Sequence, residues 1–129
     1  MKMRKILRMV PFAVLLLTTG AQLRPAPAQL TTSDLMKAKL VAAQKVLEGI
    51  STEDFTLVGR SANQLLDYSK ASAWMVQQSP EYARFTEDFR RQSTALAREA
   101  RNKNVDGATV AYFQLTISCV NCHKLIRSH

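Results

Sequence analysis

The stretch DGATVAYFQLTISCVNCHKLIRSH, residues 106–129, carries the strongest signals in this chain. Its apolar side chains recur at helical spacing, at Ala108, Ala111, Tyr112, Leu115 and Ile126. Cys119 and Cys122 are the only cysteines of the 129 residues, and His123 follows directly. Residues three and four apart lie on one face of a helix, so both thiols and the imidazole project from the same side.

Three further segments show the same period. The first comprises Met36, Leu40, Ala43, Leu47 and Ile50. The second comprises Phe55, Val58, Ala62, Leu65, Ser69, Ser72 and Val76, and the third Tyr82, Phe85, Phe89, Gln92 and Leu96. No segment alternates as a strand does. Four helices of similar length with short connections predict an all-α fold, an antiparallel up-down-up-down four-helix bundle.

Several polar residues mark where these helices begin. Thr32 or Ser33 is expected to cap the first helix, and Asp106 the fourth. Ser79 followed by Pro80 fits the start of the third, because proline is favoured at the first helical position.

The N-terminal residues 1–28 have the order of a secretory signal peptide. A basic head, MKMRKILR, precedes the apolar run MVPFAVLLL, and small residues end at Ala28. The run is about half of the ~20 residues that cross a bilayer, so stable membrane insertion is not expected. We therefore expect residues 29–129 to be the exported, periplasmic domain.

The net charge is lower when residues 1–28 are left out. The formal net charge is +8, from 18 basic and 10 acidic residues, but five of the basic ones lie in residues 1–28. Thirteen basic against 10 acidic residues leaves +3. The basic excess is mostly a targeting signal, and nucleic-acid binding is not expected.

The sequence CVNCH admits four interpretations. A redox dithiol usually begins a helix that follows a strand, a zinc site would need His129 as a fourth ligand, and two buried, inert cysteines would need no function. The motif is typical of c-type haem attachment, in which two thiols form thioethers with the vinyl groups and the histidine binds iron. We predict one covalent haem c, held by Cys119 and Cys122, with His123 as the proximal iron ligand.

Bundle topology indicates which residues surround that haem. The end of the fourth helix lies beside the start of the first, the end of the second and the start of the third. The expected wall contains Met36, Leu40, Trp74, Met75, Tyr82 and Phe85.

The mature chain resembles the cytochrome c′ family. CVNCHKLIR matches the family's closing pattern CxxCHxxxR, with Arg127 at the arginine position beside the proximal histidine and Ile126 where an aromatic residue is frequent. SPEYARFTEDF is similar to the family's start of helix three. The resemblance implies a haem pocket that includes Arg127, and a homodimer formed through helices one and two.

The sixth iron position distinguishes the functions that remain. Met36 is the leading candidate ligand and Met75 the second, since methionine ligation is frequent in electron-transfer haems. With Leu40 covering the iron instead, the resemblance implies a five-coordinate haem protein that binds nitric oxide or carbon monoxide.

Electron transfer with periplasmic redox partner proteins is the favoured function. We do not expect an enzyme, because His129 and Asp34 are poorly placed to move protons at the iron. Four basic residues near that end could steer an acidic partner or pair with the haem propionates: Lys37, Arg84, Lys124 and Arg127.

Overall fold

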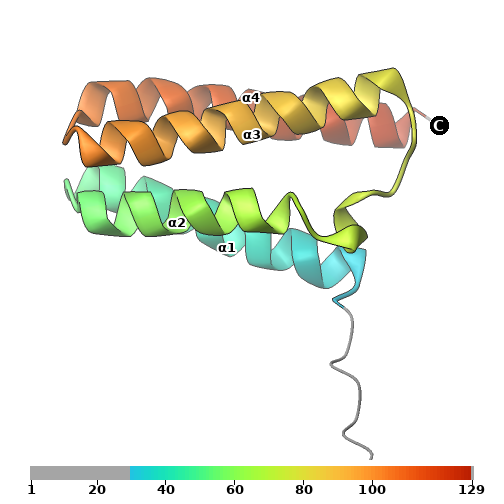
Figure 1. Cartoon of the computed structure of the whole chain (residues 1–129), viewed down its shortest axis with the longest axis horizontal. Coiled ribbons are helices and arrows are strands. Elements are labelled where there is room, and N and C mark those ends of the chain that lie inside the picture. Colours follow the sequence, from blue (N-terminus) through green and yellow to red (C-terminus); the bar gives the residue numbers. More distant parts are fainter. Residues whose placement is uncertain (1–29, 129) are drawn as a thin grey trace, which may run out of the picture.

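The protein is a bundle of four long helices (Figure 1). The structure is a computed structural model that describes residues 30–128. Its elements are α1 (Thr32–Ser51), α2 (Phe55–Tyr68), the 3-10 helix η1 (Ser72–Trp74), α3 (Pro80–Arg101) and α4 (Val105–Arg127). Residues 30–128 contain no strand. The predicted all-α four-helix bundle is confirmed. The predicted signal peptide, residues 1–28, lies outside the described residues.

The helices form a ring in which neighbours in sequence are neighbours in space. One layer holds α1 and α2, the other holds α3 and α4, and successive helices run in opposite directions (Figure 1). Contacts are dense between α1 and α2, α2 and α3, and α3 and α4, but sparse between α4 and α1. The bundle is therefore loosest where the last helix meets the first. No described helix has the length and hydropathy needed to cross a membrane.

A polar side chain accepts a hydrogen bond from a backbone N–H at the start of each long helix, which satisfies one of the unpaired donors there. The caps are Thr31, Asp54, Ser79 and Asn104. Ser79, with Pro80 after it, begins α3 as predicted. The caps of α1 and α4 each lie before the residues that the sequence suggested.

The buried face of α1 is shifted by one position along the chain from the predicted stripe, and only Ile50 belongs to both. Leu40 is 60% exposed and Leu47 is 49% exposed, whereas Val46 is fully buried. The residues that face the core are Leu35, Lys39, Ala42, Val46, Gly49 and Ile50. Both sets have helical spacing, but Lys39 interrupts the buried set with a charged residue. The sequence pattern therefore favoured the stripe with Leu40 and Leu47, and that prediction was wrong.

The second helix is shorter than its periodicity indicated. α2 ends at Tyr68, and the chain then crosses the end of the bundle through η1 before Ser79 begins α3. Arg90 of α3 fixes this departure by donating hydrogen bonds to the backbone oxygen and the hydroxyl of Ser69, at 2.8 and 3.0 Å. The crossing places Trp74 inside the bundle, where 2% of it is exposed.

The phase of α1 can be tested with adjacent substitutions. Val46→Ala should lower the free energy of unfolding by about 2 kcal/mol, because two buried methyl groups are lost and a cavity remains. Leu47→Ala should change it by less than about 0.5 kcal/mol, because the side chain is half exposed. Denaturant unfolding of both variants measures the difference, and a larger loss for Leu47→Ala would contradict the observed phase.

Candidate functional site

The last turns of α4 bring Cys119, Cys122 and His123 together opposite α1. Both cysteines are free and half-buried. Two cavities flank them. The first, of about 390 Å³ and here called the Cys122 cavity, is lined by Met36, Lys39, Trp74, Tyr82, Cys122, His123 and Arg127, among others. The second, of about 370 Å³ and called the Cys119 cavity, is lined by Met36, Lys37, Lys39, Leu40, Ala43, Cys119 and His123, with Ser33.

The two cavities share three lining residues. Met36 and Lys39 approach from α1, and His123 from α4. One thiol therefore faces each cavity, while the imidazole, the thioether and the amine border both. Each volume falls within the ~300–1,000 Å³ typical of ligand pockets. Two thiols, an imidazole, a thioether and an amine thus converge on the sparsely packed seam between α1 and α4.

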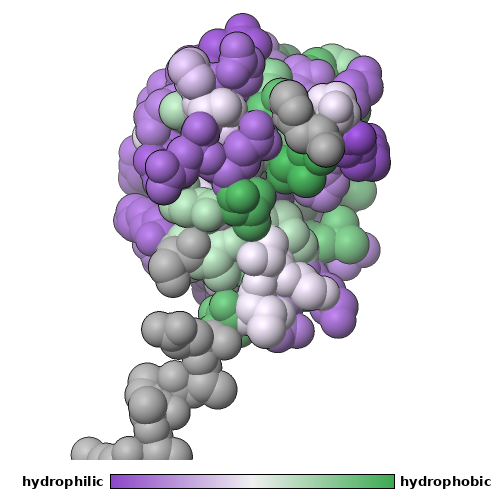
Figure 2. Space-filling model, turned by 90° about the vertical axis from the view of Figure 1, so that its right-hand side faces the viewer, coloured by the Kyte–Doolittle hydropathy of each residue, from purple (hydrophilic) through white to green (hydrophobic). Residues whose placement is uncertain are grey.

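Figure 2 shows the end of the molecule at which these residues lie. Apolar side chains gather in the middle of this face, and hydrophilic ones surround them (Figure 2). Ile126, 41% exposed, and Val76, 45% exposed, both line the Cys122 cavity and contribute apolar surface here. A hydrophobic opening with a polar rim suits a largely apolar ligand that keeps one edge near water.

Trp74 is the most tightly held residue in the wall of the Cys122 cavity. Its indole N–H donates to Thr86 Oγ1 at 3.0 Å, and the Tyr82 hydroxyl donates to the Trp74 carbonyl oxygen. Its ring also packs on Phe89, with centroids 4.8 Å apart. The indole N–H and the carbonyl oxygen of Trp74 are thus paired within the protein, which fixes the position of the ring at the edge of the Cys122 cavity.

Lys39 is the unexpected member of the site. Only 8% of it is exposed. Its amine lies 4.7 Å from the ring centroids of both Trp74 and Phe89. None of the ion pairs found within residues 30–128 includes this amine. The cation therefore rests on two aromatic faces between the cavities.

Burial favours the neutral forms of the Cys122 thiol and the His123 imidazole. Burial raises the pKa of the Cys122 thiol, an effect that the charge of Lys39 partly opposes and Cys119 reinforces. The pKa of His123 is lowered, first by the surrounding protein and then by the charges of Lys39 and Arg127, although the ring is reached by solvent. At neutral pH the imidazole accordingly has a free lone pair, which a metal ligand requires.

The structure brings together some of the predicted pocket residues and separates others. Trp74, Met36 and Arg127 line the cavities with His123, and Leu40 lies on the rim of the Cys119 cavity. Phe85 instead lines a separate groove beside Lys124 and Leu125. It points there because the buried face of α3 is formed by other residues, including Phe89 and Thr86.

Two other sequence candidates are excluded from the cavity walls. Met75 is 56% exposed and lines neither cavity. Asp34 accepts a hydrogen bond from the Thr31 hydroxyl at 2.7 Å and belongs to the cap of α1. Phe89 was on the predicted third stripe and could have been placed from the sequence. Nothing in the sequence pattern signalled Lys39, because a lysine is usually found on the surface.

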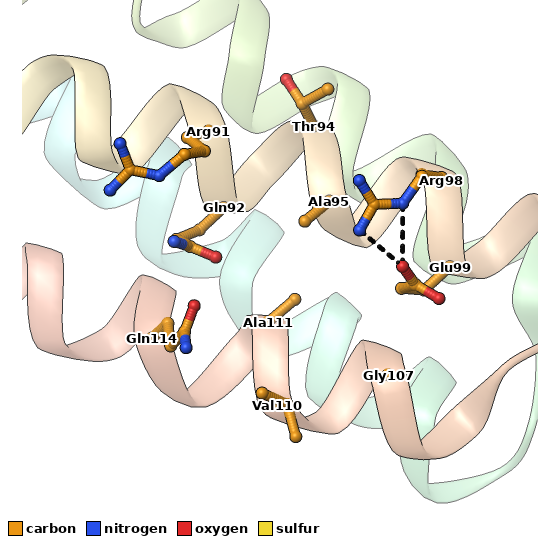
Figure 3. A pocket seen from close by; sticks show the side chains of 10 residues that line it. All are labelled: Arg91, Gln92, Thr94, Ala95, Arg98, Glu99, Gly107, Val110, Ala111 and Gln114. Atoms are coloured by element: carbon orange, nitrogen blue, oxygen red, sulfur yellow. Dashed lines mark hydrogen bonds and ion pairs between the residues drawn. The ribbon is translucent and has the colours of Figure 1, made fainter.

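A larger cavity, of about 670 Å³, lies between α3 and α4 toward their shared loop (Figure 3). Arg98 and Glu99 on its wall bond to each other, at 2.7 Å. Hydrogen bonds from Arg98 and Asn104 lower the pKa of Glu99. Its wall contains no cysteine or histidine. Since its charged groups are already paired, this groove is a weaker candidate than the cavities around His123.

Within residues 30–128, no three His, Cys, Asp or Glu side chains form a cluster that could hold a metal ion. His129, the proposed fourth ligand of a zinc site, lies outside the described residues. No protein-family model, curated protein or solved structure matches this chain. The site therefore defines a class by its own chemistry: a helical bundle with two free thiols and one imidazole at an apolar cavity pair.

The raised pKa of Cys122 gives a direct chemical test. In a Cys119→Ser variant, the rate at which iodoacetamide alkylates Cys122 should reach half its maximum at a pH above 9.0, the ordinary pKa of a thiol. The reason is that only the thiolate reacts. The rate is followed by mass spectrometry across a pH series. The same variant unfolded in guanidinium serves as the control and should react faster at neutral pH. Equal rates would contradict the burial of this thiol.

Proposed function

We propose that this protein is an exported, periplasmic c-type cytochrome that carries electrons. One haem c is covalently attached through Cys119 and Cys122, and His123 is its proximal iron ligand. The observation that carries the proposal is the convergence of both thiols and the imidazole on a pair of adjoining cavities with an aromatic wall. The motif CxxCH has the residue types and the order that c-type haem attachment requires.

The residues present fit such a group. Both thiols are free, and they border adjoining cavities that share Met36, Lys39 and His123, so both can reach a single ring placed there. The neutral imidazole supplies a nitrogen lone pair to the metal. Trp74 and Phe89 exclude water from the interior side. When bound, the haem iron supplies reversible one-electron redox chemistry.

Met36 is the strongest candidate for the sixth ligand. It borders both cavities together with His123, whereas Met75 points to solvent. Thioether ligation raises the reduction potential of a haem and suits a carrier. Flexible packing by the same side chain would leave the iron five-coordinate and open to nitric oxide or carbon monoxide. This second function is separated from the first by experiment.

Features of the opening support electron transfer over catalysis. The described residues that line the two cavities include no carboxylate that could relay protons to a bound oxidant. Lys37 borders the Cys119 cavity and Arg127 the Cys122 cavity. Positive charge around an exposed redox centre favours encounter with an acidic redox partner protein.

The optical spectrum of the exported protein tests the proposal. Produced in cells that mature c-type cytochromes, the reduced protein should show a low-spin haem spectrum that carbon monoxide leaves unchanged. A Cys119→Ser, Cys122→Ser variant is the control and should retain no covalent haem after denaturation. A colourless wild-type protein would refute the proposal, and a high-spin spectrum shifted by carbon monoxide would establish the gas-binding function instead.

The substitution Met36→Leu tests whether Met36 is the sixth iron ligand. The reduced spectrum should become high-spin and responsive to carbon monoxide, because the thioether is replaced by a group that cannot bind iron. Met75→Leu, on the exposed side chain, should leave the spectrum as it was. A low-spin spectrum in Met36→Leu would assign the sixth position to another residue.

Trp74 is expected to support the haem as well as the fold. Trp74→Ala should lower the stability of the holoprotein by about 3–5 kcal/mol, because a large buried ring is removed. Met75→Ala, the neighbouring exposed position, should change stability by less than about 0.5 kcal/mol. Thermal melts followed at the haem absorbance measure both, and equal melting of the two variants would contradict the placement of the wall.

A further inference from the structure

The position of Lys39 is costly for the chain by itself. The residue is in the middle of the buried face of α1, between Leu35 and Ala42. Removing an ammonium from water is unfavourable unless an opposite charge or several hydrogen bonds replace the hydration. No carboxylate within residues 30–128 forms an ion pair with Lys39. A leucine or methionine at this position would satisfy the helix and the core without that cost.

The contacts with two aromatic rings compensate only part of the hydration free energy that the ammonium loses on burial. The amine is equally distant, at 4.7 Å, from the centroids of Trp74 and Phe89. Such contacts attract a cation through the negative faces of the rings but leave its full charge in place. The rings therefore hold the ammonium at a fixed position and do not neutralise it.

The charge of Lys39 borders both cavities of the site. Lys39 lines both the Cys122 and the Cys119 cavity, beside Met36 and His123. Whatever occupies the cavities therefore lies beside a positive charge that takes part in no ion pair within residues 30–128.

We propose that Lys39 is the tuning residue of the redox centre: its buried ammonium favours the state of the occupant that carries one more electron. The inference rests on the proposed function, and it assigns to Lys39 a role separate from attachment or ligation. Uptake of one electron from a reduced partner protein lowers the net charge of the site by one, and the partner is oxidised because it gives up that electron. No proton transfer is needed, because the lysine acts through its charge.

The test is the reduction potential of the holoprotein. Lys39→Met keeps the length and volume of the side chain but removes the charge, and it should lower the equilibrium constant for reduction at least tenfold, or about 59 mV for one electron. Lys39→Gln should act in the same direction, since it too is neutral. Lys39→Arg should keep the potential close to that of the wild type.

Lys45→Met is the matched control. It removes one positive charge from α1 at an exposed position paired with Glu48, and it should leave the potential nearly unchanged because solvent screens it. Potentials come from spectroelectrochemistry, and the spectra report the iron ligands at the same time. Unchanged potentials in both neutral variants would overturn the inference while leaving the haem assignment intact.

Two other results would also overturn it. A changed spin state in both neutral variants would make Lys39 an iron ligand, and loss of haem from both would make it an attachment residue. A wild-type protein without haem would instead refute the proposed function, so the two failures are distinguishable.

Discussion

The cluster around Trp74 holds the functional end of the bundle in place. The segment between α2 and α3 has no long helix of its own, and it is fixed by contacts of this residue with Tyr82, Thr86 and Phe89 on α3. The start of α1 joins the same cluster, because the Thr32 hydroxyl donates to the Ala73 carbonyl oxygen at 3.1 Å. Without these contacts the end of the bundle would lack the wall that faces His123.

The site combines a rigid side with an adaptable one. The aromatic wall is buried and hydrogen-bonded, whereas the seam between α1 and α4 is sparsely packed. Met36, with its flexible side chain, lies on that seam. A bundle built in this way can admit a large flat group between its first and last helices while the other helix pairs keep their packing.

The sequence predicted the fold best where a helix carried several independent signals of its start or its buried face. The third helix was placed correctly at its start because Ser79 and Pro80 give two independent signals. The buried face of α1 was assigned wrongly because Met36, Leu40 and Leu47 form a continuous apolar stripe beside the true one, which contains a lysine. The end of α2 was missed because the helical spacing of small residues continues past Tyr68 after the helix has stopped.

The sequence by itself determined the class of fold and the set of donors. Four periodic segments with short connections leave few alternatives to a bundle, and residues 119, 122 and 123 must share a helix face because the α-helical repeat requires it. Only the tertiary structure decided what faces those donors. It turned Phe85 away, packed Phe89 against Trp74 and placed the Lys39 amine against both rings. The rotation of one helix against its neighbours is decided by packing across the whole core, and a local pattern does not contain that information.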